Sequence, residues 1–122
     1  MNNIEVIKEN TDEVKLTLYN ANGPYQLTST DYVVFTVRKD INDDNYLFRR
    51  RINPSDYSEE KGYYPIPILS TDTQDVEIGN HQEYAYYKYD VTLYNTVDTI
   101  FQKTLYRGDF LIGWRASKGS DT

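Results

Sequence analysis

Residues 84–94 alternate between two sets of side chains, and this alternation is the strongest constraint that the sequence places on the fold. The first set is mainly apolar (Ala85, Tyr87, Tyr89, Val91 and Leu93), and the second is more polar (Tyr84, Tyr86, Lys88, Asp90, Thr92 and Tyr94). Because successive strand residues point to opposite faces of a sheet, we predict a long strand whose first set faces the core. No segment of useful length shows the apolar period of about 3.6 residues that is typical of an amphipathic helix.

Shorter alternating segments predict further strands at residues 14–18, 31–38, 46–52, 63–69, 99–106 and 110–115. The polar loop 40–45 joins two of them, which we expect to pair as an antiparallel hairpin. Arg107, Gly108 and Asp109 predict a turn between the last two strands. Residues 70–78 are expected to hold at most one short helical turn, capped by Ser70 or Asp72. Short strands separated by turn residues predict an all-β sandwich or barrel.

Two segments are expected to lie at sheet edges. Pro65 and Pro67 remove two N–H donors from the same side of their strand, so that side cannot be fully paired. The run Arg49-Arg50-Arg51 puts charge on both faces of another strand, with Arg49 and Arg51 sharing one face. Such charge protects an edge strand from aggregation, and the alternative is a salt-bridged contact between subunits.

The length of 122 residues predicts a single domain over 1–122, with a core at about 12–116 and a loose tail at 117–122. Thirteen tyrosines stand against four phenylalanines and one tryptophan, so we expect a thin core lined by tyrosine. The formal net charge of −6 disfavours nucleic acid and anionic membranes as partners.

The chain contains no cysteine, which excludes disulfides and a thiolate nucleophile and suits a reducing cytoplasm. Residues 1–5 show neither the basic region nor the apolar run of a signal peptide, so secretion by that route is not expected. No apolar run approaches the roughly 20 residues of a membrane-spanning helix.

The sequence supplies no catalytic constellation and no cofactor motif. His81 is the single histidine and lies in a polar run, where a solvated loop residue is the expected role. Asp40, Asn42 and Asp44 match the first ligand positions of a calcium loop, but Asn45 and Arg51 replace its glycine and its bidentate glutamate. Asx turns explain this loop better than a weak Ca²⁺ site, so we predict no catalytic residue and no metal ligand.

Tyr84, Tyr86 and Tyr94 share the outer face of the long strand and, with Tyr63 and Trp114 nearby, could form an aromatic platform. Such a platform suits a protein interface, where tyrosine is enriched, or stacking against sugar rings. A loop covering that face is the third interpretation, and the sequence leaves all three open.

Several segments together carry a resemblance to a known family. In chain order they are Val33-Val34-Phe35-Thr36-Val37-Arg38-Lys39-Asp40, Leu47-Phe48-Arg49-Arg50-Arg51-Ile52, Ile68-Leu69-Ser70-Thr71-Asp72-Thr73, Tyr87-Lys88-Tyr89-Asp90-Val91, Thr99-Ile100 and Gly108-Asp109-Phe110-Leu111-Ile112. Their order and spacing over residues 12–116 resemble the N-terminal β-sandwich domain of siphophage upper-baseplate proteins and related prophage proteins. The resemblance implies an immunoglobulin-like Greek-key sandwich of about seven to nine antiparallel strands.

The resemblance also implies a structural or assembly role in a phage or prophage tail or baseplate, without enzymatic activity. Expected partners are other virion or baseplate proteins or further copies of the chain, on particles assembled in the bacterial cytoplasm. The candidate contact residues are Tyr84, Tyr86, Tyr94, Arg49, Arg51, Pro65 and Pro67. The alternative function is a carbohydrate-binding module that recognises host cell-wall glycan through exposed tyrosine and tryptophan.

Overall fold

The computed structural model describes residues 3–40 and 42–114, and the tail expected at 117–122 lies outside them. Within that part of the chain there are nine strands: β1 (Ile4–Ile7), β2 (Asp12–Leu16), β3 (Leu18–Asn20), β4 (Gly23–Tyr25), β5 (Asp31–Arg38), β6 (Phe48–Ile52), β7 (Tyr64–Ile68), β8 (Tyr84–Asn95) and β9 (Gln102–Gly113). Two three-residue 3₁₀ turns, η1 (Pro54–Asp56) and η2 (Ser70–Asp72), flank β7. The all-β prediction is confirmed.

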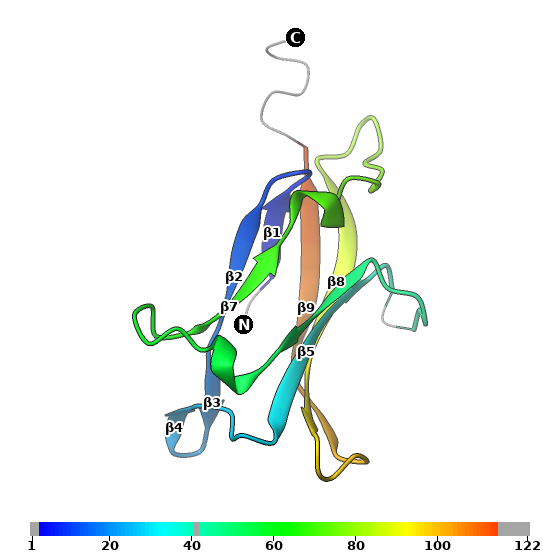
Figure 1. Cartoon of the computed structure of the whole chain (residues 1–122). Coiled ribbons are helices and arrows are strands. Elements are labelled where there is room, and N and C mark those ends of the chain that lie inside the picture. The colour runs from blue at the N-terminus through cyan, green and yellow to red at the C-terminus, as the bar shows by residue number, and fades with distance from the viewer. Residues whose placement is uncertain (1–2, 41, 115–122) are drawn as a thin grey trace.

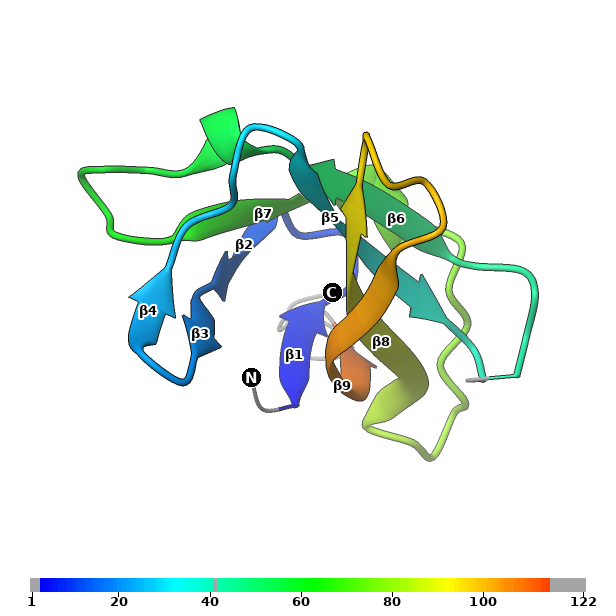
Figure 2. The same ribbon diagram turned by 90° about the horizontal axis from the view of Figure 1, so that it is seen from below.

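The strands form a sandwich with one large and one small layer (Figure 1). The large layer is a five-stranded sheet in the order β1-β9-β8-β5-β6, and the small layer is the pair β2-β7. The hairpin β3-β4 continues from β2 at one side of the molecule, as the view along the layers shows (Figure 2). In an immunoglobulin-like Greek key, β5, β8 and β9 take the places of strands C, F and G, and β2 and β7 those of B and E.

Alternation places the core between the layers as predicted. Val33, Phe35 and Val37 of β5 are fully buried, and they meet Ile66 of β7, which is also fully buried, in one apolar cluster. The predicted tyrosine lining is present, because Tyr64 and Tyr89 are almost completely buried. Burial raises the pKa of both phenols, so they remain neutral near neutral pH.

Tyrosine hydroxyls also join the layers to the loops and strands around them. The backbone N of Leu27 donates a 2.7 Å hydrogen bond to the Tyr64 hydroxyl, and the Tyr106 hydroxyl donates a 2.9 Å bond to the backbone oxygen of Thr17. A phenylalanine could fill the same volume, but it would leave these polar groups of the backbone unpaired.

The turn predicted at residues 107–109 is wrong, because β9 runs through them without a break. Gly108 pairs with Tyr89 of β8, and a Cβ on Gly108 would lie 2.9 Å from Cε1 of the Tyr89 ring. The glycine is therefore required by close packing against an aromatic ring in an extended strand, and no turn is needed to explain it.

Two further expectations need correction. β1 was not predicted, and it pairs with β9 in parallel, so the sandwich is not wholly antiparallel and its core begins before residue 12. The single helical turn expected within residues 70–78 is present as η2, and η1 was not predicted; it forms where Pro54 fixes a helical φ and the Asp56 carboxylate accepts a hydrogen bond from Asn53 N. The predicted cap, Ser70 or Asp72, is wrong, because the N-cap residue of η2 is Leu69 and the Asp72 carboxylate accepts a hydrogen bond from its N–H.

The Tyr89–Gly108 contact makes a testable prediction. Gly108→Ala should lower the free energy of unfolding by about 1–3 kcal/mol, because the new methyl group overpacks the Tyr89 ring. Urea denaturation would measure the change. In a Tyr89→Leu background the same substitution should cost clearly less, and an equal cost in both backgrounds would contradict this account.

Candidate functional site

The outer face of the five-stranded sheet, which is turned away from β2 and β7, brings charged side chains from four strands together. The register aligns Arg49 of β6 with Thr36 of β5, Thr36 with Asp90 of β8, and Asp90 with Arg107 of β9. These four residues form one row across the sheet. Side chains from opposite ends of the sequence therefore meet on a single surface.

A bulge in β9 completes this surface. Val91 pairs with Tyr106 but Thr92 pairs with Thr104, so Leu105 is an extra residue in β9. Residues 104 and 107 would point to opposite faces in a regular strand, and the bulge puts both on the outer face.

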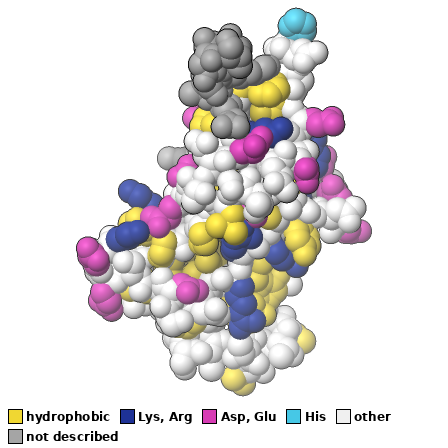
Figure 3. Space-filling model, turned by 45° about the horizontal axis from the view of Figure 1, so that its top comes forward, with side chains coloured by type: hydrophobic (Ala, Val, Ile, Leu, Met, Phe, Trp, Pro, Cys, Tyr) yellow, Lys and Arg dark blue, Asp and Glu magenta, His cyan; other side chains and the backbone are white. Residues whose placement is uncertain are grey.

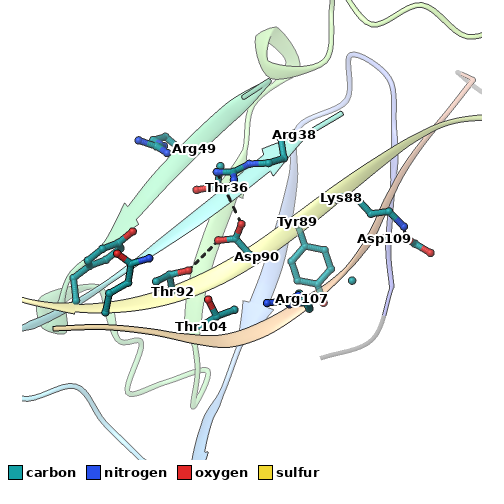
Figure 4. Close-up of a pocket in the computed structure, with 13 residues that line it drawn as sticks. Thr36, Arg38, Arg49, Lys88, Tyr89, Asp90, Thr92, Thr104, Arg107 and Asp109 are labelled. Carbon is teal, nitrogen blue, oxygen red and sulfur yellow. Dashed lines mark hydrogen bonds and ion pairs between the residues drawn. The ribbon is translucent and has the colours of Figure 1, made fainter. Parts of the chain in front are cut away.

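A hollow of about 510 Å³ opens on the outer face around this row (Figure 4). Four cationic side chains line it, Arg38, Arg49, Lys88 and Arg107, together with two carboxylates, Asp90 and Asp109. We call it the basic hollow, because it carries two excess positive charges in a chain whose net charge is −6. In Figure 3, Lys and Arg side chains gather with hydrophobic ones in the lower half of the visible face, and most acidic side chains lie around its edges and in its upper half.

Asp90 is the acceptor at the centre of the basic hollow. Its Oδ1 accepts a 3.0 Å hydrogen bond from the Thr92 hydroxyl, and its Oδ2 lies 4.0 Å from Nη2 of Arg38. The second distance is an ion pair without a hydrogen bond. Nε of Arg38 is buried and has no hydrogen-bond acceptor among the described residues. This N–H of Arg38 is therefore left without a hydrogen bond inside the sheet surface.

The other cations differ in how they are neutralised. Lys88 pairs with Asp109, and both side chains are largely exposed. No carboxylate of the described residues lies within ion-pair distance of Arg49 or Arg107. Arg49 instead stacks on Tyr46, with its guanidinium carbon 4.1 Å from the ring centre. Among the described residues, these two arginines thus line the hollow without forming an ion pair.

Aromatic stacking extends the basic hollow toward β6. The Arg51 guanidinium carbon lies 3.8 Å from the centre of the Tyr32 ring, and Tyr32 stacks on Tyr94 at 5.4 Å between ring centres. This series runs from β6 through β5 to β8. Cation–π contacts of this kind hold an arginine in one orientation while its charge stays in water.

The candidate residues on β8 form two clusters. Tyr94 belongs to the stack described above, whereas Tyr84 and Tyr86 make an edge-to-face pair at 6.3 Å near the start of β8. A hydrogen bond to Glu5 raises the pKa of Tyr84. Tyr63 lies at the small layer, where its hydroxyl donates to Glu13 of β2. A single continuous aromatic platform is therefore not formed.

Pro65 and Pro67 lie on the opposite side of the sandwich from the other candidates. They pair in register with Lys15 and Glu13 of β2, and no second described strand pairs with β7, so the predicted edge position is confirmed. β6 is likewise an edge strand, as expected from its arginines. The structure thus brings Arg49, Arg51 and Tyr94 together and leaves the prolines apart.

Arg50 has a role that the sequence did not reveal. It lies opposite Phe35 on the inner side of β6, where its guanidinium pairs with Asp72 of η2. The Asp72 carboxylate also accepts the hydrogen bond from Leu69 N, so this pair attaches the 3₁₀ turn after β7 to the edge of the large sheet. The alternation of strand residues predicts that Arg50 points to the opposite face from Arg49 and Arg51, but it does not identify Asp72 as the acidic partner of Arg50.

The tip of the β8–β9 hairpin is a second surface that the sequence analysis missed. Val97 and Ile100 are 76% and 91% exposed, and Phe101 is 39% exposed. The loop is nevertheless ordered by hydrogen bonds, because Oδ1 of Asn95 accepts 2.9 Å bonds from the backbone N of Val97 and of Asp98. In the sequence, the apolar residues inside this turn were the signal that could have identified the surface.

The loop after β5 contains Asx turns as expected, since Asp40 and Asp43 accept hydrogen bonds from the backbone N of Asn42 and Asn45. Over residues 3–40 and 42–114, no group of three His, Cys, Asp or Glu side chains has an arrangement that could hold a metal ion. His81 lies exposed in the loop before β8.

Scans against protein-family models and curated proteins return no match for this chain. No helix in the described part of the chain is long and apolar enough to cross a membrane.

The two carboxylates of the basic hollow should differ in their effect on stability. Asp90→Asn should lower the free energy of unfolding by about 1–2 kcal/mol, because it removes the counter-charge of the half-buried Arg38. Asp109→Asn, at an exposed pair, should cost less than about 1 kcal/mol. Urea denaturation of both variants would measure the difference, and equal losses would show that Asp90 does not neutralise Arg38.

Proposed function

We propose that this chain is a non-enzymatic assembly module of a phage or prophage virion, placed in the tail or baseplate and acting through protein–protein contacts. The virion setting comes from the sequence resemblance over residues 12–116. One structural observation carries the contact role: no strand among residues 3–40 and 42–114 packs on the outer face of the five-stranded sheet, which combines arginine with tyrosine. These residue types are enriched where protein interfaces concentrate their binding energy.

The edges of the sandwich support the outer face as the main contact surface. Pro65 and Pro67 leave β7 a poor template for strand addition, and Arg49 and Arg51 place charge along β6. Pairing of a partner strand at these edges is therefore discouraged. Contact through side chains of the outer face requires no strand pairing, so neither the prolines of β7 nor the charges of β6 hinder it.

The ordered tip of the β8–β9 hairpin offers a second contact. Ile100 and Val97 are held in solvent by a hydrogen-bonded turn, so little conformational freedom is lost when a partner covers them. Partners would be other virion proteins or further copies of the chain, and assembly would take place in the bacterial cytoplasm.

A carbohydrate-binding module for cell-wall glycan is the second candidate, and exposed Tyr86 is the observation that favours it. Trp114 donates its indole N–H to the backbone oxygen of Gln82 and packs partly against the core, so only part of its ring surface remains for a sugar. The two tyrosine clusters on β8 would have to act as separate subsites.

Size-exclusion chromatography with light scattering, over a range of protein and salt concentrations, tests the proposal. We expect a discrete oligomer that Tyr86→Ser combined with Tyr94→Ser weakens by at least tenfold in dissociation constant, because two aromatic contacts are lost. Tyr19→Ser is the matched control, since Tyr19 is 61% exposed on β3, away from the outer face. Native secondary structure should persist in all variants.

Two results would overturn the assembly role. The first is an oligomer that Tyr19→Ser disrupts as strongly as the double substitution does, which would remove the outer face as the interface. The second is a monomer at every concentration whose Trp114 fluorescence is quenched by a cell-wall polysaccharide. That outcome would establish the carbohydrate-binding alternative.

A further inference from the structure

The basic hollow has a fixed spacing between its two unpaired arginines. Arg49 and Arg107 stand at the ends of the row Arg49–Thr36–Asp90–Arg107, which crosses three strand-to-strand intervals. At about 4.8 Å an interval, their backbones lie about 14 Å apart. Figure 4 shows the two side chains on opposite sides of Asp90.

The donors of the basic hollow exceed its acceptors. No described carboxylate forms an ion pair with Arg49 or with Arg107, although Asp90 is the cross-strand neighbour of Arg107. A guanidinium binds a carboxylate through two parallel hydrogen bonds. The excess of positive charge in the hollow therefore favours an anionic group of a partner at Arg49 and Arg107.

We propose that the basic hollow binds two carboxylates of an extended acidic segment of a partner protein, which lies across the strands of the sheet. This inference rests on the proposed contact role of the outer face and adds the chemistry of the partner. In an extended segment, residues four positions apart point to the same side and lie about 13 Å apart. That separation matches the distance between Arg49 and Arg107.

Asp90 selects against a continuous polyanion. It lies between Thr36 and Arg107 in the row, so a ligand with an anion at every subunit would place negative charge against the Asp90 carboxylate. Two separated carboxylates place fewer negative charges near Asp90, and the one at Arg107 has that arginine as its direct counter-charge. The arrangement therefore favours an acidic peptide over polyphosphate or nucleic acid.

Binding of labelled synthetic peptides to the full chain, followed by fluorescence anisotropy, tests the inference. One threonine-rich peptide carries two glutamates four residues apart, and its control has the same composition with the glutamates three residues apart, on opposite sides of the strand. We expect the first peptide to bind at least fivefold more tightly, and both affinities to fall as salt is raised. Equal affinity for the two spacings would overturn the proposal.

Charge deletions locate the site. Arg49→Ala and Arg107→Ala should each weaken binding of the first peptide about tenfold, because each removes a charge-assisted pair of hydrogen bonds. Lys103→Ala is the matched control: it removes a cation from exposed β9 outside the hollow and should leave affinity unchanged. Circular dichroism would check that every variant is folded. Unchanged affinity in both arginine variants would overturn the proposal.

Two further outcomes would replace the proposed occupant. Polyphosphate that competes as well as the first peptide would show a general anion site. Self-association that is lost in the Arg49→Ala and Arg107→Ala variants would show that a second copy fills the hollow. The proposed function is judged separately, because the Tyr86 and Tyr94 experiment uses no acidic peptide. If assembly depends on those tyrosines while neither peptide binds, the contact role stands and only the acidic partner is rejected.

Discussion

The contact between the Tyr89 ring and Gly108 is the constraint on which the large sheet depends. It lets β8 and β9 run side by side, each 12 residues long, with the aromatic ring filling the space where a side chain would stand. Asp90 and Arg107, the residues next to this contact, point the other way and begin the basic hollow. Core packing on one face of the hairpin thus fixes the spacing of charges on the other.

The two faces of the sheet tolerate charge for different reasons. On the inner side, Arg50 is acceptable because Asp72 neutralises it at the rim, where both are less than a quarter exposed. On the outer side, Thr36 and Thr92 are buried beneath their long neighbours, so a polar floor lies under the arginines. Arg51 rests on Tyr32 and Arg49 on Tyr46, and these contacts orient the guanidinium groups without neutralising them. A surface of this kind is ordered before any partner arrives.

Sequence alternation predicted most of the strands and the buried faces of β5 and β8, because a period of two survives in any half-buried strand. It failed at Gly108, because the sequence does not distinguish a glycine required by close packing from a glycine required by a turn. It also missed β1, whose four residues are too few for a pattern. The candidate residues Arg49, Arg51 and Tyr94 were identified individually, but their meeting with Arg107 depends on the bulge at Leu105, which reverses the phase of β9. The adjacent apolar pair Leu105-Tyr106 interrupts the alternation and was the one local sign of that bulge.

The net charge of the chain and the charge of the basic hollow act over different distances. At physiological ionic strength, electrostatic interactions in water fade over about 8 Å, which is less than the distance of about 14 Å between Arg49 and Arg107. An approaching anionic segment therefore experiences the overall charge of −6 only weakly, and the local arginines dominate once contact begins. Long-range attraction contributes little to such an encounter, so discrimination between partners has to come from the positions of their carboxylates. Stacking of Arg49 on Tyr46 fixes one end of this pair, and such rigidity makes discrimination by position effective, because a flexible pair of cations would accept many spacings.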